Sequence, residues 1–286
     1  MYISNNNMRL LSLLNHYGYC GVLLSWGVIL AFAFALNALV KNSNRQALWW
    51  FIVFGGELIA LCFTYVRASI LVAILGIIGV FVYWAYIYHR KFNYRRLAGL
   101  VIILVGAVMI IAINTSSFQI LVERFVSIFK GDLSTHHRLI LTWLGAQIML
   151  DNPVFGVGLD NFKYVVLNTP AYLNIFPWIL PGGGDENVST SHNIFTEYGS
   201  IAGIPAALLI TSILLYGVYL IYALSPKSRQ NNREDIAVCL FGLLLSMVLM
   251  LPFEYALVLK PQGMAFFIIY ALATKFQTLL CENAKK

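Results

Sequence analysis

Charged side chains are scarce in this sequence. Only 11% of its 286 residues are Asp, Glu, Lys or Arg, whereas about a quarter is usual in a soluble domain. Because 60% of the residues are hydrophobic, a single water-soluble core could not bury them all. The composition therefore excludes an ordinary soluble domain and indicates a protein of the lipid bilayer.

Several motifs that would announce a particular chemistry are also missing. The sequence has no Asp-x-Asp for a metal-bound nucleotide sugar, no Gly-rich phosphate loop ending in Lys-Ser/Thr, no Gly-x-Ser-x-Gly and no His-Glu-x2-His. These absences argue against ATP-driven transport, serine hydrolysis and zinc proteolysis. The four cysteines lack metal-ligand spacing, so we expect free thiols, with a Cys20–Cys62 disulfide as the alternative. We expect neither a metal nor a cofactor.

Hydropathy rises in blocks, each near the roughly 17–25 residues that a helix needs to cross a bilayer. The blocks cover residues 18–40, 47–66, 68–88, 97–113, 201–224, 236–252 and 263–280. The sequence thus predicts an all-α polytopic membrane protein with about seven transmembrane helices. Its expected parts are an N-terminal bundle over 1–113, a loop subdomain over 114–200 and a C-terminal bundle over 201–286.

Most of the 19 basic residues fall in the intervals 41–45, 90–96, 227–233 and 275–286. Short cytoplasmic loops collect Lys and Arg, so these intervals and the C-terminus are expected inside, and the long loop outside. The net charge of +7 is then explained by topology and requires no nucleic acid. An outside N-terminus without a cleavable signal suggests the C-terminal portion of a longer protein, unless one span is misassigned.

The long loop has its own expected helices. A surface helix is predicted over 118–129, a second over about 134–150, and a short third over 193–198 that stops at Gly199. Helix-breaking residues separate these segments. The pattern indicates a folded extracytoplasmic subdomain.

His192 lies at the start of the third helix, next to the membrane. An imidazole can act as a base near neutral pH. Asn193 and Glu197 share a helical face at i,i+4 and could orient a substrate or the imidazole. A purely structural histidine is the alternative.

Two arginines are candidate phosphate ligands, because a guanidinium binds phosphate oxygens bidentately. Arg67 lies at the outer membrane face, where a snorkelling anchor is the alternative. Arg138 lies near a helix N-terminus, where a cation opposes the helix dipole and calls for an anionic partner; a solvated surface residue is the alternative. Glu57, beside the small residues Gly55-Gly56 in the second span, is either functional or a paired residue of the bundle.

Four short motifs occur in a fixed order along the chain. They are Thr64-x2-Arg67, Arg138-x4-Trp143-x2-Ala146, Asp151-Asn-Pro153-Val-Phe-Gly156-Val-Gly158-Leu-Asp-Asn-Phe162, and His192-Asn193-x3-Glu197-Tyr-Gly199-x3-Gly203. Together they resemble the O-antigen ligase and polymerase superfamily of bacterial envelope glycosyltransferases. The resemblance runs from about residue 20 to the end of the chain. It departs at Val66, where the family commonly has Ser.

The resemblance implies a GT-C-like fold in the bacterial inner membrane, with the large loop in the periplasm. The donor would be a glycan linked to undecaprenyl diphosphate, whose charge Arg67 and Arg138 would neutralise without a metal. His192 would deprotonate the acceptor hydroxyl, with inversion at the anomeric carbon. Gly156 and Gly158 would support the site, together with Asn193 and Glu197.

The acceptor would be a lipid A–core sugar for a ligase or the growing glycan for a polymerase, and a third branch of the family glycosylates proteins. The motifs do not choose among these. Membrane lipids are the other expected partners, and the oligomeric state stays open. A transporter or flippase and a truncated, inactive family member are the remaining alternatives.

Overall fold

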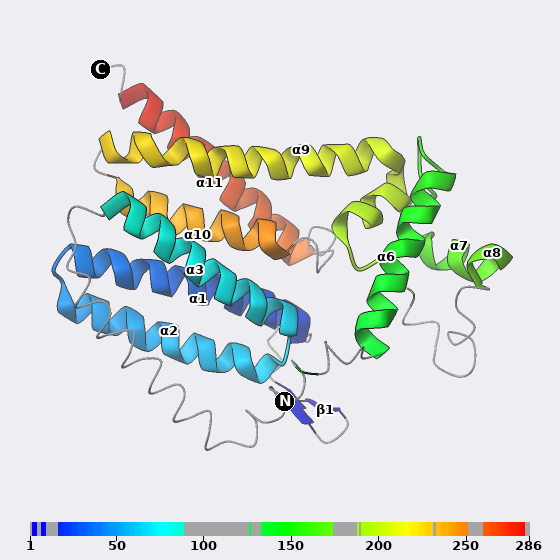
Figure 1. The fold of residues 1–286 in the computed structure, drawn as a ribbon, viewed down its shortest axis with the longest axis horizontal. Helices are drawn as coiled ribbons and strands as arrows, with labels where there is room; N and C mark the ends of the chain where they lie inside the picture. Colours follow the sequence, from blue (N-terminus) through cyan, green and yellow to red (C-terminus); the bar gives the residue numbers. More distant parts are fainter. Residues whose placement is uncertain are drawn as a thin grey trace. The chain divides into compact units, whose positions relative to one another are not determined.

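The computed structural model describes residues 2–4, 7–9, 17–88, 126, 133–173, 188, 190–230, 233–250 and 260–283. Apart from one short antiparallel pair, β1 (Tyr2–Ser4) and β2 (Asn7–Arg9), the described elements are helical, as predicted (Figure 1). The helices are α1 (Tyr17–Val40), α2 (Asn44–Thr64), α3 (Arg67–Tyr88), α6 (Leu133–Asp151), α7 (Phe162–Asn168), α8 (Pro170–Leu173), α9 (Ile194–Gln230), α10 (Glu234–Met250) and α11 (Lys260–Asn283).

These elements form two compact units. The first, the bundle unit, holds α1, α2, α3, α10, the end of α9 from Val218 and α11 from Phe267. The second, the loop unit, holds α6, α7, α8 and α9 up to Gly217. The three domain ranges expected from the sequence remain a prediction.

Four helices are long and apolar enough to cross a membrane: Cys20–Val40, Asn44–Thr64, Arg67–Tyr88 and Ile194–Leu220. They correspond to the first, second, third and fifth predicted spans. The fourth predicted span, 97–113, and the predicted surface helix over 118–129 lie outside the described residues, Val126 excepted. The helix α10, with 17 residues, and the apolar stretch Phe267–Leu279 are shorter than the other spans. Seven spans therefore remain a prediction.

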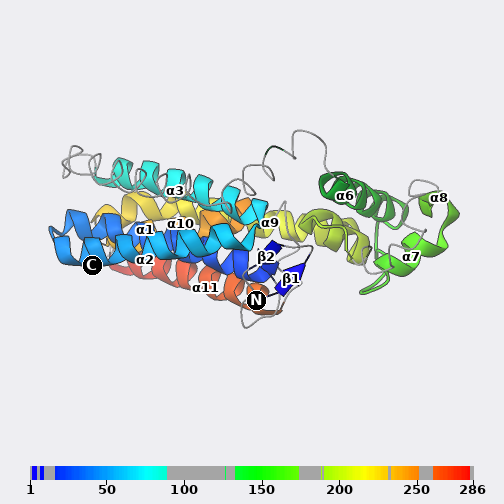
Figure 2. The ribbon, with the colours of Figure 1, turned by 90° about the horizontal axis from the view of Figure 1, so that it is seen from below.

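In the bundle unit, α1 is the central helix and packs against α2, α3 and α10 (Figure 2). In its spanning stretch 67% of the residues are buried, against 28% in α2, so α2 is the more peripheral helix. Small residues allow the close approach, as is usual between membrane helices. A Cβ added at Gly76 would lie 2.3 Å from Ile29 Cδ1, and one added at Gly242 would lie 2.7 Å from a methyl carbon of Val80.

The carboxylate of Glu57 packs against α1. An added Cβ at Gly27 would lie 2.8 Å from Glu57 Oε1, whereas one at Gly55 or Gly56 would meet no neighbouring atom of the described residues. Among the described residues, no helix therefore packs closely against Gly55 or Gly56. Cys20 and Cys62 are free thiols, so they form no disulfide.

Candidate functional site

The loop unit is built around α6. One buried cluster joins this helix to α7, α8 and the segment before α9, and it consists of Leu141, Leu144, Ile148, Phe162, Val166, Tyr172 and Val188. The hydroxyl of Tyr172 donates a hydrogen bond to Asp151 Oδ2, which ties α8 to the end of α6. Burial and this hydrogen bond raise the pKa of Tyr172 to about 12. The cluster thus holds α6, α7 and α8 together.

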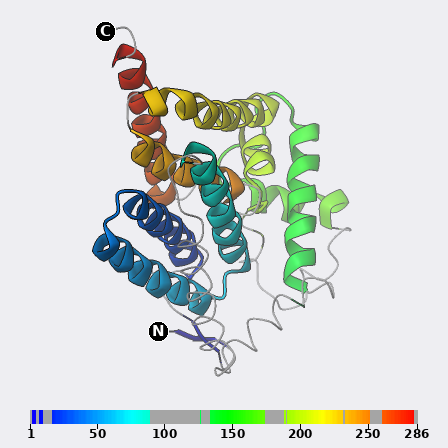
Figure 3. The same cartoon turned by 60° about the vertical axis from the view of Figure 1, so that its left-hand side comes forward.

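The helix α6 also packs closely against the start of α9 (Figure 3). A Cβ added at Gly145 would lie 2.7 Å from Ser191 Cβ and 3.0 Å from Thr196 Cβ. One added at Gly199 would lie 2.2 Å from Met149 Sδ. Glycine at positions 145 and 199 therefore brings the chain around His192 against the helix that carries Arg138.

His192 has a left-handed backbone conformation, with φ of 57°. Few residues other than glycine adopt it, and it costs about 1–3 kcal/mol, so neighbouring contacts must hold it in place. Thr142 Oγ1 donates to the carbonyl of Ser191 (3.0 Å), and the backbone N–H of Ser191 donates to Glu197 Oε2 (2.6 Å). Both contacts fix the residue just before His192.

Asn193 fixes the backbone that follows His192. Its Oδ1 accepts hydrogen bonds from the backbone N–H of Phe195 (3.0 Å) and of Thr196 (3.5 Å), which is the geometry of an N-cap. The buried Glu197 and the capping Asn193 thus hold the backbone on either side of His192. The sequence singled out both residues, but nothing in their spacing revealed that their partners are backbone groups.

The structure brings His192 and Arg138 into electrostatic range of one another. Burial, then the positive charge of Arg138, then that of His137, lower the pKa of His192 to about 4. Burial and Arg138 also lower the pKa of His137. Arg138 lies in the second turn of α6, because this helix begins at Leu133, one residue before the predicted start at about 134. Burial and the nearby Arg138 therefore favour the neutral form of His192.

The helix α9 has a break at Ala202 (φ −133°) and Gly203 (φ 81°). The prediction that the short helix stops at Gly199 is wrong, since helical structure continues past it. Pro205 explains the position of the break: proline has no N–H to offer Ile201, four residues earlier, and its ring would clash with that carbonyl. The break places a bend shortly after the segment that carries His192.

The turn that follows α6, residues 153–158, contains Gly156 and Gly158 and is called the glycine turn here. It forms hydrogen bonds with the backbone on both sides of this break. Three backbone hydrogen bonds join them: Val157 N–H to Ser200 O (2.8 Å), Gly158 N–H to Ile201 O (2.9 Å) and Ile204 N–H to Pro153 O (2.8 Å). Groups that a continuous helix would have paired internally are paired with the turn instead. Gly156 and Gly158, predicted as supporting residues, therefore hold the bent helix. Gly203 also approaches the turn closely, since an added Cβ would lie 2.5 Å from Val154 O, and the Gly-x-Pro pattern of residues 203–205 was the signal for the break.

This contact leads to a prediction about the two glycines of the turn, Gly156 and Gly158. Both have positive φ, 62° at Gly156 and 88° at Gly158, but an added Cβ at Gly156 would lie 2.4 Å from the backbone of Ile201. At Gly158 it would meet only the Asn161 side chain, at 3.1 Å. We expect Gly158→Ala to cost about 1–2 kcal/mol of backbone strain and Gly156→Ala clearly more. Thermal unfolding of both variants in detergent measures the difference; equal stability would contradict the contact.

Arg67 belongs to the bundle unit, whereas the other predicted site residues belong to the loop unit. It is the first residue of α3 and is half-buried. Tyr65, in the left-handed conformation (φ 54°), ends α2, and Val66 N–H donates to Thr64 Oγ1 (3.3 Å). This tight link places Arg67 between two helices long enough to cross a membrane, and its position at the outer face remains a prediction.

Among the described residues, no group of three or more His, Cys, Asp and Glu side chains is placed to hold a metal ion. The adjacent His136 and His137 differ in exposure, since His136 is exposed and His137 is half-buried. The two rings thus face different surroundings.

A family model described as O-antigen ligase matches residues 50–211. The match covers more than half of the chain and includes Arg67, Arg138, Gly156, Gly158 and His192. It confirms the family that the sequence motifs resemble. No curated protein matches the chain.

Proposed function

Because the chain belongs to the O-antigen ligase family, we propose that it transfers a glycan from undecaprenyl diphosphate to a sugar hydroxyl of lipid A–core. The reaction takes place at the periplasmic face of the bacterial inner membrane and inverts the anomeric carbon. The observation that carries this proposal is the backbone of His192, held between Ser191 and Asn193 and within electrostatic range of Arg138, where burial and the guanidinium lower the pKa of the imidazole. A neutral imidazole can accept a proton, and a nearby guanidinium can bind a diphosphate.

In the proposed reaction, the acceptor hydroxyl oxygen attacks the anomeric carbon of the donor. A ring nitrogen of His192 takes the hydroxyl proton. The bond between the anomeric carbon and the diphosphate oxygen breaks, and its electron pair leaves with undecaprenyl diphosphate. Arg138 and Arg67 stabilise the charge that develops on this leaving group, which is where fixed cations lower a barrier most.

The structural residues have a definite part in this scheme. Ser191 is held through its carbonyl and its N–H, and Asn193 caps the helix that follows. The backbone on either side of His192 is thereby held in place. Pre-organisation of this kind lowers the entropic cost of reaching the reactive geometry.

The depressed pKa of His192 leads to a prediction on pH dependence. Its ordinary value is 6.5, and burial and Arg138 lower it to about 4. Protonation abolishes a base, so we expect kcat/KM to fall only as the pH drops through about 4. Bound diphosphate adds negative charge and favours the imidazolium, so the acidic limb of kcat should lie at higher pH. A kcat/KM limb at 6.5 would contradict the environment described for His192.

The acceptor is tested in cells. A strain lacking this protein should accumulate free lipid A–core while its long glycan chains stay intact on the lipid carrier. Glycans of a single repeat unit would instead identify a polymerase, and loss of glycan from proteins alone would identify a protein oligosaccharyltransferase. Transfer by the purified protein from a synthetic undecaprenyl-diphosphate glycan to lipid A–core tests the donor directly.

A further inference from the structure

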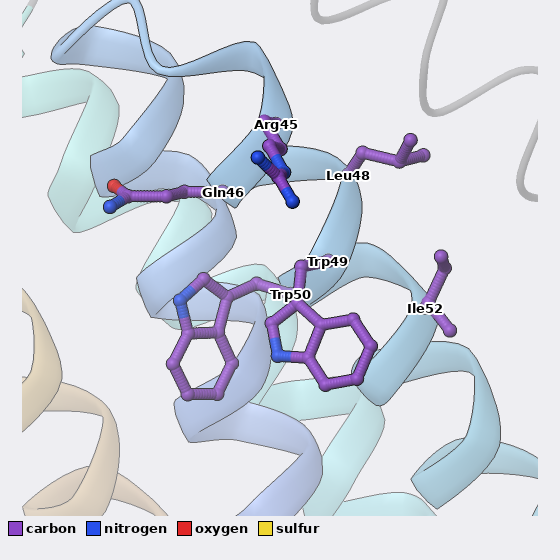
Figure 4. Close-up of a pocket in the computed structure, with 6 residues that line it drawn as sticks. All are labelled: Arg45, Gln46, Leu48, Trp49, Trp50 and Ile52. Carbon is purple, nitrogen blue, oxygen red and sulfur yellow. The ribbon is translucent and has the colours of Figure 1, made fainter.

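The bundle unit contains two adjoining grooves that the transfer reaction does not use. One runs along the outer side of α2 and is lined by Arg45, Gln46, Leu48, Trp49, Trp50 and Ile52 (Figure 4). The second lies between α1, α2 and α10, has a volume of about 470 Å³, and includes Asn37, Lys41 and Asp235. Gln46 and Trp50 line both grooves, so the two adjoin at this pair.

Both grooves are polar at one end and apolar along the rest. On α1 the lining changes from Lys41 and Asn37 to Phe34 and Leu30, a distance of roughly 16 Å along the helix axis. On α2 it changes from Arg45 and Gln46 to the exposed apolar side chains that follow. Two apolar grooves with polar groups at one end suit an amphiphile that has one head group and two chains.

The side chain of Trp50 lines both grooves and is held in place by a neighbouring ring. Its indole stacks on Phe34, with ring centroids 4.7 Å apart. The neighbouring Trp49 is 61% exposed. Tryptophan is enriched where a membrane helix meets the headgroup region, so the pair marks the level of the lipid head.

The polar end offers specific contacts to an anion. Arg45 lies in the first turn of α2, and the N-cap residue of that helix, Ser43, makes no side-chain capping hydrogen bond. The first backbone N–H groups of α2 and the guanidinium therefore point to the same kind of ligand, a phosphate. Lys41 adds a second cation, although Asp235 binds it at 2.7 Å.

A buried acceptor lies at the same end. Asn37 is 5% exposed, and its Nδ2 donates to the carbonyl of Asp235 (2.9 Å) and to Cys239 Sγ (3.7 Å). Its Oδ1 has no hydrogen-bond partner. An acceptor left unsatisfied in a buried position costs free energy, and Asn37 is one of the residues that line the second groove.

We propose that these grooves bind an anionic phospholipid with a hydroxyl-bearing head, namely phosphatidylglycerol. Its phosphate binds Arg45 and the N-terminus of α2, and a glycerol hydroxyl donates to Asn37 Oδ1. Its two acyl chains lie in the grooves on either side of Trp50. The site occupies the end of the bundle that the distribution of Lys and Arg predicts to be cytoplasmic, where basic residues bind anionic lipids.

Native mass spectrometry of the full chain, released from detergent with defined lipids, tests this proposal without any assay of transfer. We expect phosphatidylglycerol to be retained about tenfold better than phosphatidylcholine, and Arg45→Gln to remove this preference. The matched control is Lys275→Gln, which removes the same charge from an exposed position that lines neither groove. Equal loss in both variants would show a diffuse charge effect and overturn the site.

Phosphatidic acid separates the two contacts, because it has the phosphate but no glycerol hydroxyl. We expect the wild-type chain to prefer phosphatidylglycerol over phosphatidic acid, and Asn37→Leu to lose that preference while keeping the phosphate contact. If Asn37→Leu does not fold, the wild-type preference alone decides. Equal retention of the two lipids by the wild type would overturn the proposal. A dimer that persists when phosphatidylglycerol is added would also overturn it, because a second copy of the chain would then cover the grooves.

Discussion

Replacing His192 with asparagine is expected to abolish most glycan transfer while the protein stays folded in the membrane. Asparagine tolerates the left-handed conformation that His192 adopts (φ 57°), but its amide is not a base. A general base contributes roughly 10²–10⁴-fold to a rate, and a loss of this size in kcat is the expected result. The measurement is turnover by purified protein with an undecaprenyl-diphosphate donor.

Two further variants sharpen this experiment. His192→Ala should lose as much activity as the asparagine variant but unfold at a lower temperature, because alanine is less tolerant of positive φ. His136→Ala removes an exposed imidazole from α6 and should keep normal turnover. Normal transfer by His192→Asn would refute the base assignment, and a loss in His136→Ala equal to that in His192→Asn would show that the effect is not specific.

Arg67→Lys is expected to lose about ten- to a hundredfold in kcat although it keeps the positive charge. A lysine ammonium is a point charge and cannot form the two parallel hydrogen bonds of a guanidinium to phosphate oxygens. If these bonds strengthen as the diphosphate leaves, the loss appears in kcat and kcat/KM together. Steady-state kinetics with a varied donor concentration separate the two constants.

The control for this variant is Arg233→Lys, the same exchange at an exposed position before α10. It should change neither constant. Full retention of activity in Arg67→Lys would refute bidentate binding. A rise in KM alone would show that Arg67 holds the donor equally well in the ground state and the transition state.

Hydropathy predicted the first three spans well. The helices α1, α2 and α3 begin and end within about three residues of the predicted blocks, because a bilayer imposes the length and polarity of whatever crosses it. The family was also legible in the sequence, because its motifs are short, local patterns around Arg67, Arg138, the glycine turn and His192. The family match confirms this interpretation.

The break in α9 was misplaced for a physical reason. Gly199 is a plausible helix end in sequence, but in the structure it serves close packing against Met149. The true break, at Gly203, depends on backbone groups of the glycine turn about 45 residues earlier in the chain, which pair with the backbone groups that the break leaves without a helical partner. A pattern of neighbouring residues cannot predict a hydrogen bond between segments that are distant in the sequence.

The amino-acid sequence alone determined which segments are apolar, where charge is tolerated and which ionisable groups lie outside the spans, since these properties belong to single residues and their near neighbours. Only the tertiary structure decided the state of His192. Its lowered pKa results from burial and from Arg138 on another helix, and its backbone conformation depends on Thr142 and Glu197, which hold Ser191. A pKa and a backbone conformation are properties of an environment, and folding creates that environment.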